Sequence, residues 1–524
     1  MAAQTGATEI APDYVHAGPN SCASGWEQVE NVPLTALHSP VELPSAAVRE
    51  TKERELKFTA PDGFGSVEDL GEPIEDRVFT STYFDTRDRA LASVGVTLRR
   101  RLENGKNLWQ LKLPGQGFRH ELELPGGPAR PPRALRDPLF GLLRGNELEQ
   151  VAKLQTRRSG VRVHDGGSDR AEIVVDTVAV MDDGRERSTF CEIEVELIEG
   201  EPRVLDRIGK ALRRRGALAS DGRPKLFRAL GFAPPPSPEP KAEAPAVLHL
   251  AAMLEKQRRE ILAHDPGVRV GADAEDVHAM RVAARRSRAI LRAARSLLDQ
   301  AVSEPLRAEL QWLGSALGPV RDLDVLLDRL RTQVDALPDD DRFAAERLLQ
   351  LLAADRELAR AHLLEALEGE RYLALLDRLG EFARQPAATG REKPLRALAS
   401  RQFERLRDSV AKLPSEPTDA DLHRIRVRAK RARYAAELAQ ATVGSPAARF
   451  VARAKRLQDV IGEHQDAVVA AQRIREALGA ARGSRVAFAA GRLVEREEQR
   501  RLRARTAFPK AWRRLDKCGR RAWR

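Results

Sequence analysis

The chain has 524 residues, a formal net charge of +12 and only three cysteines, Cys22, Cys191 and Cys518. This length exceeds one ordinary hydrophobic core and predicts two or three domains, while the scattered cysteines exclude a disulfide framework and a cysteine metal site. No stretch reaches the roughly 18 apolar residues of a membrane span, and no basic region followed by an apolar run opens the chain. We therefore expect a cytoplasmic protein.

The positive charge is concentrated in the C-terminal half. Residues 251–524 contain 55 Lys and Arg against 39 Asp and Glu, whereas residues 1–250 contain 34 against 38. The basic charge of the C-terminal half predicts binding to a polyanion, which could be nucleic acid, an acidic membrane surface or an inorganic phosphate polymer. Aromatic residues make up only 5% of the chain, which counts against the stacking platforms that bind single-stranded nucleic acid.

Residues 1–48 show no sustained periodicity and are expected to form a disordered extension. Residues 49–232 read as a domain of short strands, the first at 53–58. Alternate side chains of a strand share a face, so Glu53, Glu55 and Lys57 would lie together. A solvated strand face is the ordinary explanation of such a run, and a wet cavity that holds a metal ion and an anion is the alternative.

Three later strands repeat this alternation. Their polar and charged members are Thr97, Arg99 and Arg101 in one strand, Gln110 and Lys112 in the next, and Glu192, Glu194 and Glu196 in the last. With about eight strands at short spacing, and helices near 137–143, 146–154 and 205–215, we predict an antiparallel β-barrel. A closed barrel with a polar lumen, acidic on one wall and basic on the other, would explain all four strands.

These side chains suit phosphoryl transfer, in which cations neutralise developing charge and a metal ion positions water. The candidate ligands for Mg²⁺ or Mn²⁺ are the hard carboxylates of Glu53, Glu55, Glu192, Glu194 and Glu196. The candidate phosphate-binding residues are Lys57, Arg99, Arg101, Lys112, Arg158 and Lys225. Arg158 is preferred to Arg157 because it has the same strand phase as Thr156. No Walker A loop, dinucleotide fingerprint, HExxH or GxSxG motif is present.

A proline-rich run predicts a stiff linker at 233–245. Residues 246–524 are rich in Ala, Leu and Arg with helical spacing, which predicts an all-α domain. The expected helices lie near 247–264, 273–298, 303–332, 341–366, 371–385, 392–412, 419–441, 446–462, 464–479 and 485–504. An internal repeat divides this domain into bundles at about 246–390 and 391–524, because the basic pattern that follows His278 recurs after His423.

The repeated pattern places basic residues along one stripe of each helix. The two predicted basic ridges are His278, Arg281, Arg285, Arg286 and Arg288, and His423, Arg426, Lys430, Arg431 and Arg433. Packed with pseudo-two-fold symmetry, the ridges could flank one groove that neutralises a linear phosphate polymer. A solvated basic face is the ordinary alternative, and the histidines could contact phosphate, cap a structure or respond to pH. We expect Asp322, Asp324 and Asp466 to orient these ridge arginines by ion pairing rather than to bind metal.

The ordered motifs resemble two known families. Residues 50–232 resemble the CYTH family of triphosphate tunnel metalloenzymes, whose ExExK signature stands at 53–57 and is followed by matching segments at 83–86, 97–101, 111–113, 192–196 and 224–226. Residues 245–524 resemble the CHAD domain through both His-led segments and the segment 321–325. The resemblance implies an eight-stranded tunnel that binds a triphosphate through basic residues, glutamates that hold a divalent metal, and polyphosphate binding by the helical domain.

CYTH–CHAD fusions resemble bacterial inorganic triphosphatases, so we expect metal-dependent hydrolysis of tripolyphosphate or of short polyphosphate ends. Glu53, Glu55 and Lys57 are the expected catalytic residues. Family activities on thiamine triphosphate, nucleotides and RNA leave the substrate open. The rival interpretation is a non-catalytic polyphosphate-binding protein associated with polyphosphate granules, in which both domains serve as anion sites. Nucleic-acid binding, a third class, follows from charge alone.

Overall fold

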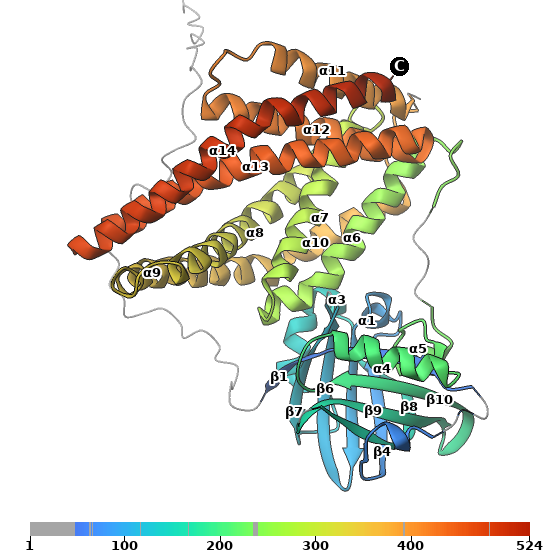
Figure 1. Ribbon diagram of the computed structural model, residues 1–524. Coiled ribbons are helices and arrows are strands. Elements are labelled where there is room, and N and C mark those ends of the chain that lie inside the picture. Colours follow the sequence, from blue (N-terminus) through green and yellow to red (C-terminus); the bar gives the residue numbers. More distant parts are fainter. Residues whose placement is uncertain are drawn as a thin grey trace, which may run out of the picture. The chain divides into compact units, whose positions relative to one another are not determined.

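The protein is described from a computed structural model (Figure 1). The structure describes residues 48–523 except 62–63, 65, 116, 166, 234–238, 391–393 and 481–482. The predicted extension, apart from residue 48, and part of the predicted linker therefore lie outside the described residues.

The N-terminal domain is built on one antiparallel sheet with strand order β1-β7-β6-β5-β4-β8-β9-β10-β2-β11, to which β3 adds beside β8. Its strands are β1 (Arg49–Glu53), β2 (Glu55–Thr59), β3 (Glu72–Pro73), β4 (Arg77–Asp85), β5 (Thr97–Glu103), β6 (Lys106–Pro114), β7 (Arg119–Pro125), β8 (Glu149–Asp165), β9 (Ser168–Asp182), β10 (Arg185–Leu197) and β11 (Leu218–Ala219). The antiparallel architecture is as predicted. The count is 11 strands rather than about eight, because three of the strands are short or split.

The sheet is not closed by a continuous hydrogen-bonded ladder, so the expectation of a fully closed barrel was wrong. The two ends of the strand path are nevertheless joined by the chain itself. Glu53 on β1 pairs with Arg119 on β7, and two residues later Glu55 on β2 pairs with Glu196 on β10. The ExExK segment thus passes from one end of the curved sheet to the other.

Alternation along the strands separates a polar inner face from an apolar outer face. Ile193 and Val195 on β10 are fully buried and pack with Phe58 of β2 and with Leu205 and Leu212 of α4 (Arg203–Arg214). Helix α4 is amphipathic and covers this outer surface. The intervening glutamates of β10 therefore point away from α4 and towards the interior of the curved sheet.

The short helices of this domain are α1 (Ala90–Ser93), α2 (Arg133–Arg136), α3 (Phe140–Leu143) and α5 (Lys225–Leu230), with 3₁₀ turns η1 (Glu68–Leu70) and η2 (Asp137–Leu139). The helix predicted at 146–154 was wrong, because β8 begins at Glu149 and continues without a break to Asp165. The spacing of Leu148, Val151 and Leu154 imitates a helical period over this short stretch.

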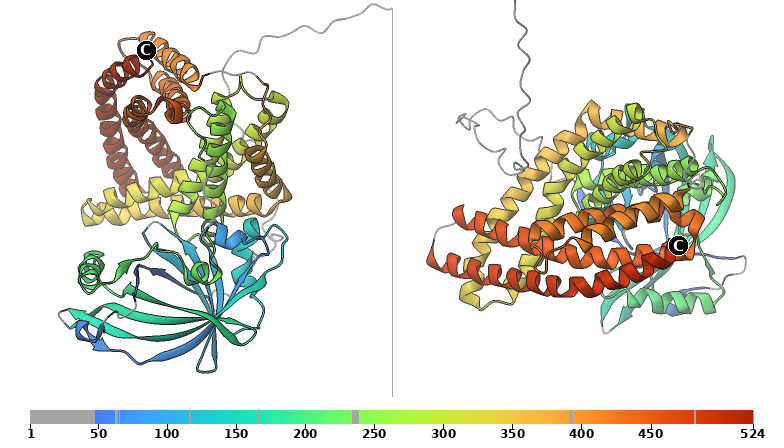
Figure 2. Two further views of the ribbon diagram at one scale, coloured as in Figure 1. Left: turned by 90° about the vertical axis from the view of Figure 1, so that its right-hand side faces the viewer. Right: turned by 90° about the horizontal axis from the view of Figure 1, so that it is seen from above.

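The C-terminal domain is helical throughout its described residues, as predicted. Its helices are α6 (Ala246–Val270), α7 (Ala274–Ala293), α8 (Gln300–Asp335), α9 (Asp339–Glu368), α10 (Glu370–Arg384), α11 (Leu395–Ala411), α12 (Asp419–Val443), α13 (Ser445–Ala480) and α14 (Ser484–Ala522). Figure 2 shows that α8 and α9, and likewise α13 and α14, form long helical hairpins. The outer halves of the two hairpins share one core that includes Leu330, Leu348, Ile474 and Leu493.

The internal repeat has a structural counterpart. His278 and His423 are each the fifth residue of their helices, α7 and α12, and each helix begins after a side chain that caps it, Asp273 or Thr418. Both helices bury the apolar positions between their basic residues, including Met280 on α7.

Two predicted helix breaks do not occur. Helix α6 continues through Pro266, and α13 continues through Gly462 as one helix where two were predicted. Helix α14 also extends well beyond the predicted 485–504. Among the described residues, no helix combines the length and the apolar character that crossing a membrane requires.

Candidate functional site

The interior of the curved sheet contains a polar cavity of about 260 Å³. Its lining combines acidic and basic side chains from most of the long strands. The charged residues of the lining are Glu53, Glu55, Lys57, Arg77, Arg99, Arg101, Lys112, Arg119, Glu121, Glu123, Arg158, Glu172, Glu194, Glu196 and Lys225. Ten of the eleven residues predicted for this site are among them, and the structure therefore brings together side chains that are far apart in the sequence.

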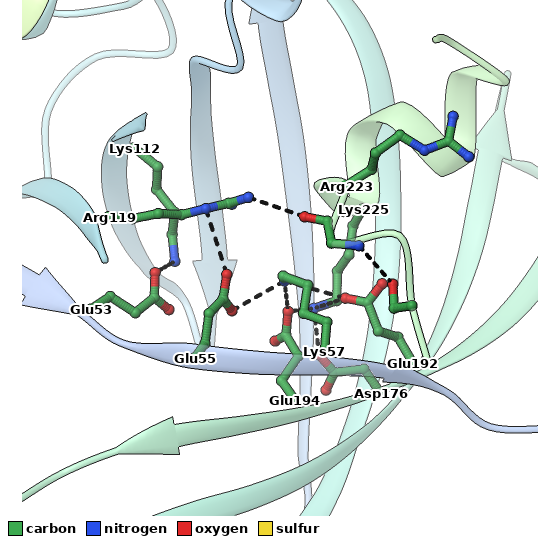
Figure 3. Close-up of polar contacts among 12 residues, drawn as sticks. Glu53, Glu55, Lys57, Lys112, Arg119, Asp176, Glu192, Glu194, Arg223 and Lys225 are labelled. Atoms are coloured by element: carbon green, nitrogen blue, oxygen red, sulfur yellow. Dashed lines mark hydrogen bonds and ion pairs between the residues drawn. The ribbon is translucent and has the colours of Figure 1, made fainter. Parts of the chain in front are cut away.

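Lys57 lies at the centre of this cavity (Figure 3), with only 7% of its side chain exposed. Its ammonium forms an ion pair with Glu194, and it lies 3.1 Å from the carboxylate of Glu55 and 3.4 Å from that of Glu192. Burial lowers the pKa of Lys57 and nearby Lys225 opposes its charge, but the three carboxylates outweigh both and the pKa is raised. Lys57 is therefore a firmly positioned cation.

A second lysine, Lys225, is held from the opposite side at the start of α5. Its ammonium lies 2.7 Å from Glu194, 2.9 Å from Asp176 and 3.2 Å from Glu192. Burial lowers its pKa, yet these carboxylates raise it above the ordinary value. Asp176 is fully buried and also accepts two hydrogen bonds from Arg158, at 2.7 and 2.8 Å.

Glu192 differs from the other predicted metal ligands. It is fully buried and is not part of the cavity lining. Its carboxylate contacts Lys57, Lys225 and, at 3.3 Å, Arg228. Three cations around one carboxylate indicate that Glu192 supports the two lysines from behind the cavity surface.

One end of the cavity is rich in cations. Arg99 donates to Gln110 at 2.8 Å and to the hydroxyl of Tyr83 at 3.3 Å. Arg101 pairs with Glu103 at 2.5 Å and stacks over the ring of Phe79. Burial and the neighbouring arginines, Arg99 first among them, lower the pKa of Arg101 to about 10. Burial is the largest cause and the neighbouring arginines add to it, so cations are crowded around Arg101.

The opposite part of the cavity is rich in carboxylates. The ammonium of Lys112 lies 2.6 Å from the carboxylate of Glu53 and 3.3 Å from that of Glu121, so that one cation forms ion pairs with two carboxylates. Glu196 lies at the exposed edge of this group, where desolvation and then the charges of Glu53 and Glu121 raise its pKa to about 7. Carboxylates are therefore crowded in this part of the cavity.

The carboxylates can be tested for their fit to a divalent metal ion. Within the described ranges, no three His, Cys, Asp or Glu side chains are grouped closely enough to hold a metal as they stand. The donors nevertheless fit in chemical type, because Mg²⁺ and Mn²⁺ prefer carboxylate oxygens. The raised pKa of Glu196 beside Glu53 and Glu121 also marks a place where an added cation would relieve repulsion.

Several lining residues were given no role from the sequence. Arg119 lies 3.6 Å from Glu55, Glu123 accepts from Gln110 at 2.8 Å, and Glu172 lies 3.4 Å from Arg77. The signal was the same alternation that identified the other strands, since Arg119, Glu121 and Glu123 occupy every second position of β7. Arg158 lines the cavity and Arg157 is exposed, as the strand phase predicted.

In the helical domain, the structure brings the two predicted ridges together only in part. Burial, then the adjacent Arg426, and then the charges of Arg285 and Arg281 on α7 lower the pKa of Lys430 on α12 to about 7. These four residues therefore form one crowded basic surface. His278 belongs with them, because burial and then the charges of nearby arginines lower its pKa.

The remaining ridge residues face other neighbours. Arg286 and Arg433 pair with Glu437 at 3.0 and 3.3 Å. The pKa values of Arg288 and Arg431 are lowered by burial and then by separate arginine neighbours, led by Arg307 and Arg292 respectively. His423 makes a hydrogen bond of 3.1 Å with Gln465.

Of the three aspartates predicted to orient ridge arginines, only Asp322 pairs with one, and the other two pair with arginines outside the ridges. Asp322 pairs with Arg281 at 2.6 Å, and Asp324 pairs with Arg356 at 3.0 Å. Asp466 lies 3.8 Å from Arg329.

Comparison with known proteins identifies the same two parts. The CYTH domain model matches residues 51–222, and the CHAD domain model matches residues 252–475. An uncharacterized protein from each of two strains of Mycobacterium tuberculosis, CDC 1551 and H37Rv, is 31% identical over 474 residues, which is 84% of this chain and 90% of the relative.

Solved structures show weaker similarity. PptA from Streptomyces chartreusis is 28% identical with a TM-score of 0.45, covering 52% of this chain and 100% of its own. The CHAD domain of Ricinus communis is 26% identical with a TM-score of 0.43, covering 53% of this chain and 94% of its own. The two domain matches and the nearly full-length relatives agree with the cavity and the repeated helices. The chain therefore belongs to the family of CYTH–CHAD fusion proteins, which join a triphosphate-tunnel domain to a helical CHAD domain.

Proposed function

We propose that this protein is a metal-dependent triphosphatase that hydrolyses inorganic tripolyphosphate or the short ends of polyphosphate. The observation that carries the proposal is one cavity whose lining gathers Arg99 and Arg101 in one part and Glu53, Glu121 and Glu196 in another. A phosphate chain would supply anions to the first part, and a divalent cation would supply positive charge to the second. Each ligand would thus relieve repulsion among the charges of the cavity lining.

The size of the cavity favours a short chain. Its volume of about 260 Å³ corresponds to roughly nine water molecules at about 30 Å³ each. A folded nucleic acid does not fit this space, whereas a short linear anion does. Because the lining has no aromatic platform apart from Tyr83, nothing in it selects for a nucleobase.

The roles of the residues follow from their positions. Lys57, Arg99, Arg101, Lys112, Arg158 and Lys225 hold the phosphate oxygens and neutralise charge that develops during transfer. Glu53, Glu55, Glu194 and Glu196 would hold the metal ion. When bound, Mg²⁺ or Mn²⁺ would polarise a phosphoryl group and favour attack by water. Glu192 and Asp176 keep Lys57 and Lys225 charged and in place.

For the helical domain, we propose polyphosphate binding by the surface formed by Arg281, Arg285, Arg426 and Lys430. Arginine gives bidentate hydrogen bonds to phosphate, and a long chain can bridge the two repeats. His278 and His423 lie at the same end of their helices and would contact the same chain. Arg286, Arg288, Arg431 and Arg433 contribute less directly, because they face other partners.

The test is phosphate release from tripolyphosphate by the purified full chain with Mg²⁺ or Mn²⁺, beside ATP and thiamine triphosphate. The proposal predicts that tripolyphosphate has the highest kcat/KM of the three. Faster turnover of ATP or thiamine triphosphate would reassign the substrate.

A second candidate is a binding protein with an idle cavity. It is favoured by the ion pairs of Lys57 and Lys225 with Glu194, which already occupy one proposed metal ligand. This candidate predicts tight polyphosphate binding without phosphate release under either metal. The same assay therefore separates the two.

A further inference from the structure

The paired ends of α13 and α14 enclose a groove of about 840 Å³ that is separate from the sheet cavity and from the ridge residues. Six basic side chains line it. They are Arg449, Arg453 and Arg456 on α13, and Arg514, Lys517 and Arg521 on α14. Both rows follow helical spacing along one side, so each presents three charges over about 10 Å at 1.5 Å per residue. The two helices lie side by side in Figures 1 and 2.

These six side chains are left without protein partners. Among the described residues, none of them makes an ion pair or hydrogen bond, and all except the half-buried Arg453 are exposed. The middle of the same helix α14 is different, because Arg500 pairs with Glu463 and Glu497, and Arg501 pairs with Asp419 and Glu498. The groove lining itself contains no such carboxylate, and the neighbouring Asp516 pairs with Arg520 rather than with any of the six.

The rest of the lining excludes several kinds of ligand. It consists of Pro446, Ala452, Cys518 and Ala522. These residues provide no carboxylate for a cationic partner, no aromatic ring for stacking a base and no side-chain amide for reading a base edge. What remains is a trough of small side chains between two rows of cations.

We propose that this groove is a second binding site for inorganic polyphosphate on the helical domain. The six cations would form charge-assisted hydrogen bonds along a phosphate chain, and release of counterions would make this binding sensitive to salt. The inference extends the polyphosphate binding proposed above, but it rests on different residues. A long chain held here and on the surface around Arg281 and Lys430 would engage the domain at two places and gain in apparent affinity.

Cys518 provides a local probe, because its half-buried thiol is part of the groove lining. The full chain is treated with a neutral alkylating reagent, with and without long-chain polyphosphate, and labelling of each cysteine is followed by mass spectrometry. Labelling of Cys518 requires an open groove, so it should slow roughly tenfold when polyphosphate is at ten times its dissociation constant. Cys191, a half-buried thiol of the sheet domain, is the internal reference and should label at an unchanged rate.

Two double variants identify where protection arises. Arg453→Gln with Lys517→Gln removes one cation from each wall and should abolish protection of Cys518. A second groove variant, Arg449→Gln with Arg521→Gln, should also abolish protection of Cys518. The test therefore remains decisive if the first variant fails to fold. Arg281→Gln with Arg426→Gln alters the ridge surface and should leave protection intact at saturating polyphosphate, so that failure of the ridge proposal is seen separately.

Unchanged labelling of Cys518 at saturating polyphosphate would overturn the inference, as would protection that persists in both groove variants. Equal or stronger protection by single-stranded DNA of the same charge would also contradict it, because the groove would then serve nucleic acid.

Discussion

Lys57 and Glu194 lie directly opposite each other on β2 and β10, and their side chains form an ion pair inside the cavity. The register of this one strand pair joins two motifs that are separated by 137 residues. The same register sets Glu55 opposite Glu196. Cross-strand neighbours interact most directly in antiparallel sheets, so the two motifs act as one charged surface.

Arg158 and Arg157 offer a matched test of phosphate binding, because they are adjacent on β8 and only Arg158 lines the cavity. We predict that Arg158→Ala raises the KM for tripolyphosphate about 10- to 100-fold, since a hydrogen bond to a charged group contributes about 1.5–3 kcal/mol. Arg157→Ala should leave KM within about twofold of the wild type. Steady-state kinetics on variants of verified fold decides this, and equal effects of both changes would refute the placement.

Asp176 should be important for stability as well as for position. It is fully buried and contacts both Arg158 and Lys225. Removing one member of a buried ion-pair network typically costs about 3–5 kcal/mol, and here Arg158 and Lys225 would both lose a buried counter-charge. We therefore expect Asp176→Asn to lower the free energy of unfolding by about that amount in urea titrations. Asp182→Asn, an exposed change at the end of the same strand, should cost less than about 0.5 kcal/mol; similar losses for the two variants would contradict this account.

Binding of polyphosphate should depend on pH through Lys430. Burial and the charges of Arg426, Arg285 and Arg281 lower its pKa from 10.5 to about 7, so the folded state binds fewer protons than the unfolded chain between these values. Its contribution to stability therefore rises with pH across that window and is lost as pH falls towards 7. A bound polyanion favours the ammonium, so affinity should fall by up to about tenfold per pH unit above pH 7.

Arginine at the same position remains charged throughout this range. Lys430→Arg should therefore flatten the pH dependence, because every other titrating group is common to both proteins. Binding titrations from pH 6 to 9 make the comparison, and an unchanged slope in Lys430→Arg would exclude Lys430 as the source.

Much of the cavity could be predicted from the sequence, because strand alternation is a strict geometric rule. Side chains alternate between the two faces of a strand, which places Glu53, Glu55 and Lys57 on one face. The same alternation, counted from Thr156, places Arg158 rather than Arg157 on the cavity face. Asp176 was missed although it has the same phase as Glu172, because it lies in a run of Val and Ile that reads as an ordinary buried strand. Its partners, Arg158 and Lys225, come from elements whose pairing the sequence does not reveal.

Helix boundaries were less predictable, because local signals compete with tertiary packing. Gly462 weakens a helix by only about 1 kcal/mol, and the buried contacts of α13 on both sides of it outweigh that cost. Pro266 similarly lies within α6 rather than ending it. The ridges could be predicted from the spacing of their basic residues. The ion pairs of Arg286 and Arg433 with Glu437 draw these two arginines away from the shared basic surface. The pair with Arg286 could not be predicted, because Glu437 is far from Arg286 in the sequence.

The central claim is tested most directly by comparing phosphate release from tripolyphosphate by the wild type, Glu53→Gln and Glu186→Gln with Mg²⁺ or Mn²⁺. Glu53 lines the cavity, whereas Glu186 is exposed near the start of β10. We predict turnover by the wild type and by Glu186→Gln, and a loss of about 100-fold or more in Glu53→Gln, since even residues that only support metal ligands contribute 10- to 100-fold. No phosphate release by folded wild-type protein with either metal, or undiminished turnover by Glu53→Gln, would contradict the claim.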